Sequence, residues 1–398
     1  MKIIKGGITA PKGYRSAGMH CGIKTSGKKD IALISSVVPA NAAAVFTSNK
    51  VKAAPILVSM ENIKGGKAQA IVANSGCANA CTGPEGMEDA RFMAKAVASV
   101  LNVKEKHVLV ASTGSIGSRL PMKSISNGIR SLSKKLSTSG NLDAADAILT
   151  TDTRRKEIAV RLNLGGKAVT IGAIAKGSGM IAPNMATMFA FITTDADVHP
   201  FKLKSYLRES VEKSFNMTVV DRDTSTNDCV FLLANGQSGK SILFGNDEKE
   251  FKQALDHVCI YLAREIARDG EGATKLIEVK AAGAGSLRDA RLTAKAVAGS
   301  DLVKSAIFGE DPNFGRIMAA LGNSGADVNP DAVNIFIGNT QVVKGGKAVQ
   351  FNVNSAKKHL KGGEVQINIM LGQGAHIATA WGCDLTYDYV KINARYHT

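Results

Sequence analysis

The run from Lys176 to Ala196 (KGSGMIAPNMATMFAFITTDA) places a threonine between a glycine-rich turn and an apolar strand. A threonine hydroxyl is a weak nucleophile unless a base lies beside it. For Thr187 that base could be its own α-amine, which exists only if the chain is cut between Ala186 and Thr187. An α-amine has a reference pKa of about 7.7–8.0, close to the neutral pH at which a general base works best.

The neighbouring residues permit such a cut. Pro183 and Asn184 favour a turn, Ala186 is small, and the apolar run Met188–Ile192 would hold Thr187 at the start of a strand. The hydroxyl would attack the Ala186 carbonyl carbon, shift the acyl group from nitrogen to oxygen, and lose it to water. The alternative is that Thr187 is only a β-branched residue opening a strand, and the spacing alone does not exclude it.

Other motifs do not support a different chemistry. The segment 236–241 (GQSGKS) lacks a glycine at Ala234, so the phosphate cradle of a Walker A loop is incomplete. The segment 177–182 fits G-x-G-x-x-A, but Pro183 follows where a dinucleotide-binding helix should continue. There is no G-x-S-x-G elbow, and the seven histidines show no metal-ligand spacing. Cys77 and Cys81 have no second pair to complete a zinc site.

Strands and helices alternate along the chain. Apolar, β-branched runs predict strands, several buried on both faces, at Ile31–Val38, Ala68–Ala73, His107–Ala111, Ala168–Ala175, Met188–Thr193, Val219–Val220 and Cys229–Leu233. Helical periodicity or composition predicts helices at Glu88–Leu101, Met122–Leu136, Phe201–Phe215, Phe251–Ile266 and Leu287–Ile307. The segment Arg130–Ala145 has the composition of a surface linker. The pattern predicts an α/β or α+β protein in layers. A length of 398 residues favours two lobes or one large layered domain.

Composition narrows the function classes. The chain is 44% hydrophobic, has six cysteines, and carries a formal net charge of +16. Its basic residues are scattered without a run of five, which favours a solvated basic surface over nucleic-acid binding and is compatible with an acidic small-molecule substrate. The N-terminus has no apolar segment of a signal peptide, and no stretch is long enough to span a membrane. We therefore expect a cytoplasmic protein with free thiols.

Polar, glycine-rich clusters lie beside the apolar runs, where layered α/β proteins build their sites. Each one alone would be an ordinary turn, but eight in one chain are harder to dismiss. They are Asn74–Asn79, Ser112–Gly117, Thr150–Thr153, Lys176–Thr187, Asp221–Asp228, Gly270–Gly272, Glu310–Gly315 and the tail Lys391–Thr398.

Taken in order, these clusters resemble the ornithine acetyltransferase (glutamate N-acetyltransferase) family, the bifunctional proteins of arginine biosynthesis. The resemblance extends over nearly the full length, from GGITAPKGYRSAG through ANSGCANACTG, STGSIG, TTDT, AKGSGMIAPNMATMFAFITTDA, DTSTNDCV, GEGATK and FGEDPNFGRI to GCDLTYDYVKINARYHT. It implies a layered fold of the self-cleaving N-terminal-nucleophile type. It also implies cleavage between Ala186 and Thr187 into an α chain (1–186) and a β chain (187–398), assembled as a heterotetramer of two of each.

The resemblance also assigns residues. It implies that Thr187 accepts the acetyl group, that Thr113 and Gly114 form the oxyanion hole, and that the substrate is bound by Thr150, Lys176, Thr187, Glu271, Asn393 and Thr398. Lys176 could meet a substrate carboxylate, and Glu271 could meet an ammonium group such as that of ornithine.

The implied reaction moves the acetyl group from N2-acetyl-L-ornithine to L-glutamate without a metal or bound cofactor. Use of acetyl-CoA as a second donor is left open. One departure is Arg222, which stands where the family pattern leads us to expect glycine and which matters if its φ is positive. Two alternatives remain: a related N-terminal-nucleophile aminopeptidase or amidase, in which water accepts the acyl group, and a non-enzymatic basic binding protein.

Overall fold

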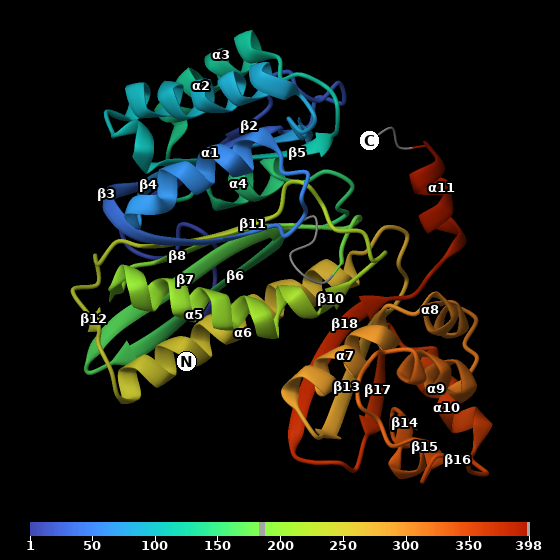
Figure 1. The fold of residues 1–398 in the computed structure, drawn as a ribbon. Coiled ribbons are helices and arrows are strands. Elements are labelled where there is room, and N and C mark those ends of the chain that lie inside the picture. Colours follow the sequence, from blue (N-terminus) through green and yellow to red (C-terminus); the bar gives the residue numbers. More distant parts are fainter. Residues whose placement is uncertain (183–187, 396–398) are drawn as a thin grey trace.

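The computed structural model describes residues 1–182 and 188–395, whose strands form a large sheet, a smaller sheet and a two-stranded pair (Figure 1). Thr187, Ala186 and Thr398 lie outside the described residues. The large sheet has nine strands, of which eight follow one path and β2 pairs with β3 beside it. In path order these strands are β1 (Lys2–Ile4), β6 (Lys156–Leu164), β7 (Lys167–Lys176), β8 (Phe189–Thr194), β11 (Cys229–Ala234), β3 (Ile31–Phe46), β4 (Lys67–Cys77) and β5 (Val108–Ser115), with β2 at Tyr14–Met19.

The large sheet is folded over, so that its two halves face each other. Alternate residues of β8 point to opposite faces: Ala190 and Ile192 join a core with the helices outside, while Phe189 and Phe191 join a core between the halves. Ile71 of β4 reaches this same inner core from the other half. The order of layers is therefore helix, sheet, sheet, helix (Figure 1).

Helices cover the two outer faces. The apolar stripe of α6 (Phe251, Leu255, Val258, Leu262) is buried, with acidic residues in its first turn and Arg268 in its last, as the helix dipole favours. Helix α6 packs outside β6 and β7, and α5 lies beside it against β3. Helices α1–α3 pack outside β2–β5, and α4 belongs to the inner core. Their bounds are α1 Ala54–Asn62, α2 Gly83–Leu101, α3 Met122–Lys135, α4 Asn141–Ala147, α5 Pro200–Lys213 and α6 Asn246–Arg268.

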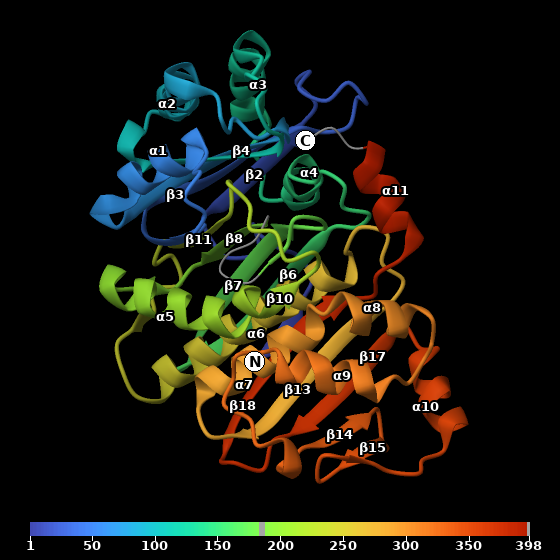
Figure 2. The same cartoon turned by 45° about the vertical axis from the view of Figure 1, so that its right-hand side comes forward.

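The second lobe contains the smaller sheet, of seven strands, with α7 packed on it. Its strands in order are β10 (Thr218–Val219), β18 (His376–Cys383), β13 (Leu276–Ala284), β17 (Glu364–Met370), β14 (Asn334–Ile337), β15 (Thr340–Lys344) and β16 (Lys347–Ala348). Its helices are α7 (Leu287–Ala298), α8 (Asp301–Phe308), α9 (Phe314–Gly322) and α10 (Val353–Leu360). The last helix, α11 (Tyr387–Arg395), leaves this lobe and returns to the level of the large sheet (Figures 1 and 2).

The remaining regular elements are short connections. They are the paired strands β9 (Asp197–Val198) and β12 (Ser241–Ile242), and 3-10 turns at Ile63–Gly65, Glu105–His107, Phe215–Met217 and Pro330–Ala332.

The predicted class, mixed α/β in layers, is confirmed. Two local predictions are wrong. Arg130–Ala145 is not a linker, because α3 runs to Lys135 and α4 starts at Asn141. The predicted helix Leu287–Ile307 is two helices, because the Ser300 hydroxyl accepts a hydrogen bond from the Val303 N–H and caps a new helix.

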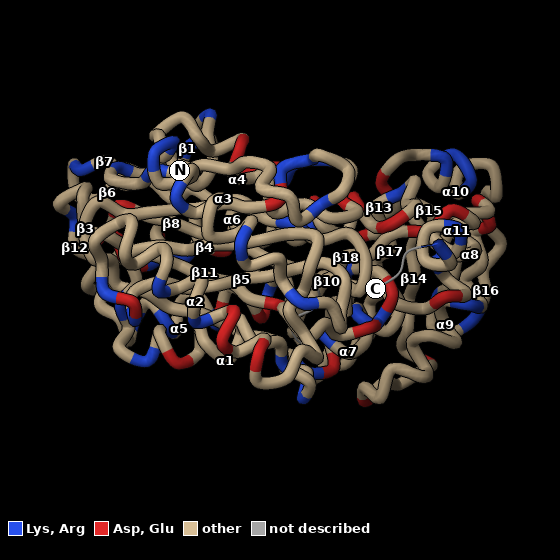
Figure 3. Tube along the Cα trace, turned by 90° about the horizontal axis from the view of Figure 1, so that it is seen from above, with Lys and Arg blue, Asp and Glu red and all other residues tan. Residues whose placement is uncertain are grey.

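The two pieces predicted from a cut before Thr187 would share one sheet. Strand β8 pairs with β7, and β11 pairs with β3, so strands from after the cut lie between strands from before it. The two halves of the chain therefore cannot separate without breaking the middle of the large sheet. In the part of the chain that the structure describes, no helix is long and apolar enough to cross a bilayer. Basic and acidic residues are both scattered over the two lobes (Figure 3).

Candidate active site

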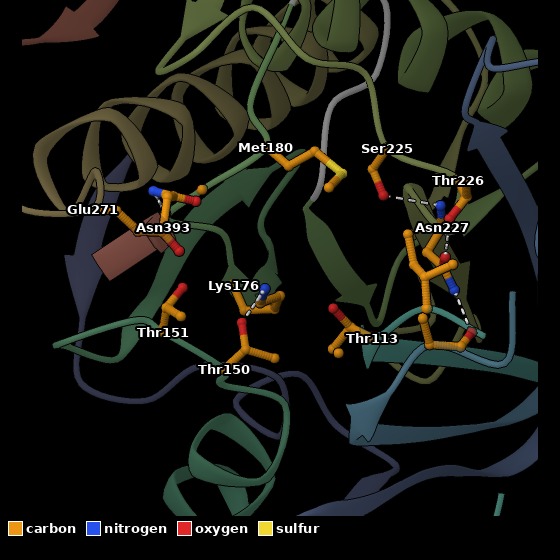
Figure 4. Close-up of a pocket in the computed structure, with 14 residues that line it drawn as sticks. Thr113, Thr150, Thr151, Lys176, Met180, Ser225, Thr226, Asn227, Glu271 and Asn393 are labelled. Carbon is orange, nitrogen blue, oxygen red and sulfur yellow. Dashed lines mark hydrogen bonds between the residues drawn. The ribbon is translucent and has the colours of Figure 1, made fainter. Parts of the chain in front are cut away.

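One pocket brings together six of the residues predicted for the site, from five separate parts of the sequence (Figure 4). These six are Thr113, Gly114, Thr150, Lys176, Glu271 and Asn393. The other lining residues are Ala78, Ile116, Thr151, Gly179, Met180, Ser225, Thr226 and Asn227. The nearest described neighbour of Thr187 in sequence is Met188, which precedes β8, and β8 pairs with the end of β7 at Lys176.

Thr113 and Gly114 lie near the end of β5, paired with Ser75 and Gly76 of β4. Gly114 has a φ of +133°, and a Cβ there would lie 2.3 Å from the carbonyl carbon of Gly76. Only glycine can therefore hold this backbone against β4. A rigid N–H and a neighbouring hydroxyl are the kinds of donor that stabilise an oxyanion.

Lys176 ends β7 and is 2% exposed. Its Nζ donates to Thr150 Oγ1 at 2.7 Å and lies 3.7 Å from Asp152 Oδ2. Burial lowers the pKa of Lys176, while the Asp152 carboxylate opposes that lowering. Glu271 is also close enough for its negative charge to raise the pKa of Lys176. The pocket therefore offers one cationic and one anionic group, which suits a zwitterionic amino acid.

A buried ionic network supports Lys176 from behind. Lys156 Nζ lies 2.8 Å from Asp152 Oδ1 and 2.5 Å from Asp269 Oδ2, and none of these three side chains is more than 1% exposed. Asp152 also accepts hydrogen bonds from the backbone N–H groups of Thr150 and Gly177. Burial alone would raise the pKa of Asp152, but Lys176 and Lys156 together lower it overall. The network thus keeps a carboxylate charged beside Lys176.

The other wall joins the loop after α6 to α11. Asn393 Nδ2 donates to Glu271 Oε2 at 2.9 Å (Figure 4). Gly179 leaves room for this carboxyl group, since a Cβ there would lie 2.4 Å from its carbon. The C-terminal helix therefore helps to place Glu271, although α11 begins more than a hundred residues later in the chain.

The Asp221–Asp228 segment supports the site through side chains that were not predicted as site residues. Asn227 Nδ2 donates to the carbonyl oxygens of Ala78 and Ser112, each at 2.7 Å, and so braces the strand that carries Thr113. Asp221 accepts from the N–H groups of Met180 (2.6 Å) and Ile181 (2.7 Å). Burial raises the pKa of Asp221 to about 6.

Arg222 has a φ of +68°, so the concern about a non-glycine residue at this position is justified. Its side chain is exposed, and the guanidinium lies 2.8 Å from the Asp301 carboxylate on α8. The strain is local to the surface of this turn, because Asp221 and Asn227 on either side keep their contacts.

One of the polar, glycine-rich clusters found in the sequence does not line the pocket. The cluster Glu310–Gly315 lies in the second lobe, where Asn313 caps α9 by accepting from the Arg316 N–H. The network residues Lys156 and Asp269 were missed, although a lysine on the same face of a strand as its buried apolar residues is a usable signal. Across residues 1–182 and 188–395, no three histidine, cysteine or acidic side chains cluster as a metal site.

The ArgJ family model matches residues 15–398. The chain belongs to the ArgJ family. It is similar to the arginine biosynthesis bifunctional protein ArgJ of Symbiobacterium thermophilum, with 53% identity over the whole of both chains. The solved ArgJ of Bacillus halodurans is 44% identical, with a TM-score of 0.51, and the match covers 52% of this chain and 98% of that one. A solved ornithine acetyltransferase of Mycobacterium tuberculosis, complexed with ornithine, is 41% identical, covers 46% of this chain and 97% of that one, and has a TM-score of 0.43.

Membership of the ArgJ family confirms the family predicted from the sequence, and with it the prediction of an acyltransferase of arginine biosynthesis.

Proposed function

We propose that this ArgJ chain transfers an acetyl group from N2-acetyl-L-ornithine to L-glutamate through an acetyl ester on Thr187. The observation that carries the proposal is the single pocket in which Thr113, Gly114, Lys176 and Glu271 meet although they are far apart in sequence. Family membership supports the reaction, and the charges of the pocket support the substrates. An aminopeptidase or amidase has no such support from the matched family.

In the proposed first step, the Thr187 hydroxyl attacks the acetyl carbonyl carbon of acetylornithine. The Gly114 N–H and the Thr113 hydroxyl stabilise the oxyanion, a contribution of about 3–4 kcal/mol for one donor in comparable sites. The C–N bond then breaks, the ornithine nitrogen takes the proton, and the acetyl group remains as an ester. In the second step the glutamate amine attacks this ester, giving N-acetylglutamate and restoring the hydroxyl.

Substrate binding follows from the charges. Lys176, held beside Thr150, would meet the α-carboxylate that acetylornithine and glutamate share. Glu271, held by Asn393, would meet the side-chain ammonium that only ornithine carries. Thr398, which lies outside the described residues, is the remaining proposed substrate-binding residue. We therefore expect Glu271→Gln to raise KM for acetylornithine about tenfold or more and to change KM for glutamate less, measured in steady-state kinetics of each half-reaction. Equal changes for both substrates would contradict the assignment.

Cleavage before Thr187 is the second part of the proposal. The Bacillus halodurans chain is matched over 98% of its length by only 52% of this one, so that chain is about half as long, which supports a protein made of two pieces. The proposed assembly is a heterotetramer of two α and two β chains, in the cytoplasm.

Denaturing gel electrophoresis with N-terminal sequencing tests the cut. We expect pieces of 186 and 212 residues, the second beginning with Thr187. Thr187→Ala should remain a single chain of 398 residues and lose acetyl transfer. An intact wild-type chain with full activity would rule out the α-amine as base.

The similar ArgJ protein of Symbiobacterium thermophilum is named as bifunctional, which supports a second activity for this chain. We propose that acetyl-CoA also acetylates Thr187. Purified enzyme with acetyl-CoA and glutamate, and no acetylornithine, should form N-acetylglutamate, and Thr187→Ala should abolish it. Absence of product, with acetylornithine transfer intact, would restrict this chain to one donor.

A further inference from the structure

Lys24 is a half-buried lysine that lies between β2 and β3, outside the lining of the pocket, and that the proposed mechanism does not use. Its Nζ donates hydrogen bonds to the carbonyl oxygens of Leu149 at 2.7 Å and Lys29 at 2.9 Å. Leu149 immediately precedes Thr150, whose hydroxyl accepts from Lys176 in the pocket (Figure 4). Hydrogen bonds from an ammonium group are stronger than those between neutral groups. Lys24 therefore ties its own loop to the segment that carries Thr150.

The loop that carries Lys24 is fixed to the strands of the predicted oxyanion hole. Asp30, which is 0% exposed, accepts hydrogen bonds from the backbone N–H groups of Cys21–Lys24. Its carbonyl oxygen accepts from the Ser75 N–H at 2.9 Å, and Ser75 pairs with Thr113 across β4 and β5. The backbone of Lys24 is therefore held in place relative to Thr113.

The stem of Lys24 packs on these strands as well. A Cβ added to Gly76 would lie 3.0 Å from Lys24 Cγ, so the glycine leaves room for the stem. Gly76 pairs with Gly114, the predicted donor to the oxyanion. The stem thus contacts the oxyanion side of the site, and the ammonium contacts the segment that carries Thr150.

The Lys24 ammonium is also close enough to the charged groups behind the pocket to interact with them. Burial lowers the pKa of Lys24 to about 8, the Asp30 and Asp152 carboxylates oppose this lowering, and the positive charge of Lys176 adds to it. The pKa remains above neutral pH, so the side chain keeps its three N–H donors there.

We propose that Lys24 is a positioning residue, which holds Thr150 and Lys176 in place to receive the α-carboxylate of both substrates. It acts through the Leu149 carbonyl and does not touch the substrate. The proposal rests on the proposed function, which assigns Lys176 and Thr150 to that carboxylate. Without the ammonium, the segment of Thr150 loses its tie to the loop, so the hydroxyl holds Lys176 Nζ less firmly.

The variant Lys24→Met tests this role, because methionine keeps the stem over Gly76 and removes only the ammonium. The KM values for acetylornithine and glutamate should both rise by about tenfold, as expected for the loss of one hydrogen bond from a charged group. The two rises should agree within about twofold, because both substrates carry the α-carboxylate, and kcat should stay within about threefold of the wild type. Steady-state kinetics of each half-reaction measures these values.

A double-mutant cycle with Thr150→Ala shows whether Lys24 acts through Thr150. Thr150→Ala should itself raise both KM values. Adding Lys24→Met should raise them no further than about twofold, because the hydroxyl whose position Lys24 sets is gone. Effects that multiply would show that Lys24 acts independently of Thr150, and they would refute the proposal.

Lys167, at the other end of β7 from Lys176, provides a matched control. Its Nζ likewise donates to the backbone carbonyl of a distant loop, that of Gly239, at 2.6 Å. Lys167→Met should leave kcat and both KM values unchanged. Melting temperatures of the two variants show whether folding is intact. Equal rises in KM for Lys167→Met and Lys24→Met would refute a specific role of Lys24.

The outcomes separate the role of Lys24 from the proposed function. If Thr150→Ala leaves both KM values at those of the wild type, the assignment of the α-carboxylate is refuted, and the role of Lys24 with it. If Thr150→Ala raises them and Lys24→Met does not, only the role of Lys24 is refuted. A rise for glutamate alone also refutes it, since the positive charge would then act on the second carboxylate of that substrate.

Should Lys24→Met not fold, Lys24→Gln takes its place, because glutamine keeps neutral N–H donors on a shorter side chain. Equal but smaller rises in the two KM values then support the role of Lys24, and unchanged values refute it.

Discussion

The pocket end of the large sheet buries its ion pairs, whereas the second lobe keeps its ion pairs at the surface. At the pocket, Asp152, Lys156 and Asp269 are paired with each other at no more than 1% exposure. In the second lobe, Glu364 on β17 is 43% exposed and pairs with two α6 arginines at the surface. Buried pairs are weak evidence for stability, because desolvation offsets their attraction. The buried charges are therefore better understood as serving the site, and the second lobe as a scaffold that closes it with Glu271 and α11.

The largest effect should come from opening the buried network. Lys156→Met leaves two buried carboxylates without their shared cation, so the free energy of unfolding should fall by about 3–5 kcal/mol. Glu364→Gln, its counterpart in the second lobe, should cost less than about 1 kcal/mol. Equilibrium denaturation in guanidinium chloride measures both. Similar costs for the two variants would remove the contrast between the regions.

Replacing a glycine of positive φ by alanine should also have a larger effect at the pocket than in the second lobe. Gly114→Ala would place a Cβ 2.3 Å from Gly76 and displace a predicted oxyanion donor, so kcat should fall about 10²–10³-fold. Gly325, in the second lobe, also has a positive φ (+71°) but has no atom within 4 Å of an added Cβ. Gly325→Ala should therefore lower the free energy of unfolding by about 1–2 kcal/mol, because only the positive φ is strained, and leave kcat unchanged. Steady-state kinetics of wild-type acetyl transfer provides the reference.

The pH dependence of stability should also separate the regions. Asp221 has a folded pKa of about 6, above the ordinary aspartate value of 3.8. Its contribution to the free energy of unfolding is therefore present below pH 3.8 and is lost as the pH rises through 6. Asp221→Asn should remove this downward slope. In the second lobe, the Ser286 hydroxyl lowers the pKa of Asp289, whose contribution changes only below pH 3.8. Asp289→Asn should leave the slope between pH 4 and 6 as it is, measured by melting temperature across that range.

The smallest effect is expected where the two regions touch at the surface. Arg222→Gly relieves a positive φ, which is worth about 1–2 kcal/mol. It also loses the exposed pair with Asp301, and glycine gains freedom in the unfolded chain. These contributions oppose each other, so stability should change by less than about 1 kcal/mol. A larger loss in thermal unfolding would show that this pair holds the lobes together.

The sequence predicted the large sheet better than the second lobe. Strand β11 is apolar throughout and β8 is apolar up to its two final threonines, because both faces of these strands are buried. Such runs are visible in the sequence. No run predicted a strand beyond Leu233. Strand β17 (EVQINIM) alternates buried and exposed residues, a weaker signal that polar positions interrupt. The break between α7 and α8 was missed because Ser300 can cap a helix or continue one.

For the site, the sequence indicated which residue types take part, but not which of them lie close together in the folded protein. The resemblance named Lys176 and Glu271, yet the Lys156–Asp269 pair joins residues 113 apart, and no spacing rule connects them. The same holds for Asn227, whose amide reaches back to the Ala78 carbonyl.

The sequence by itself determined the family, the class of chemistry and the point at which a nucleophile could arise, because these depend on residue types in a fixed order. The tertiary structure alone decided which charges are buried together and which partners they have. It also decided that strands from both sides of Thr187 share one sheet. Burial and hydrogen bonding depend on contacts between distant segments, and folding alone creates those contacts.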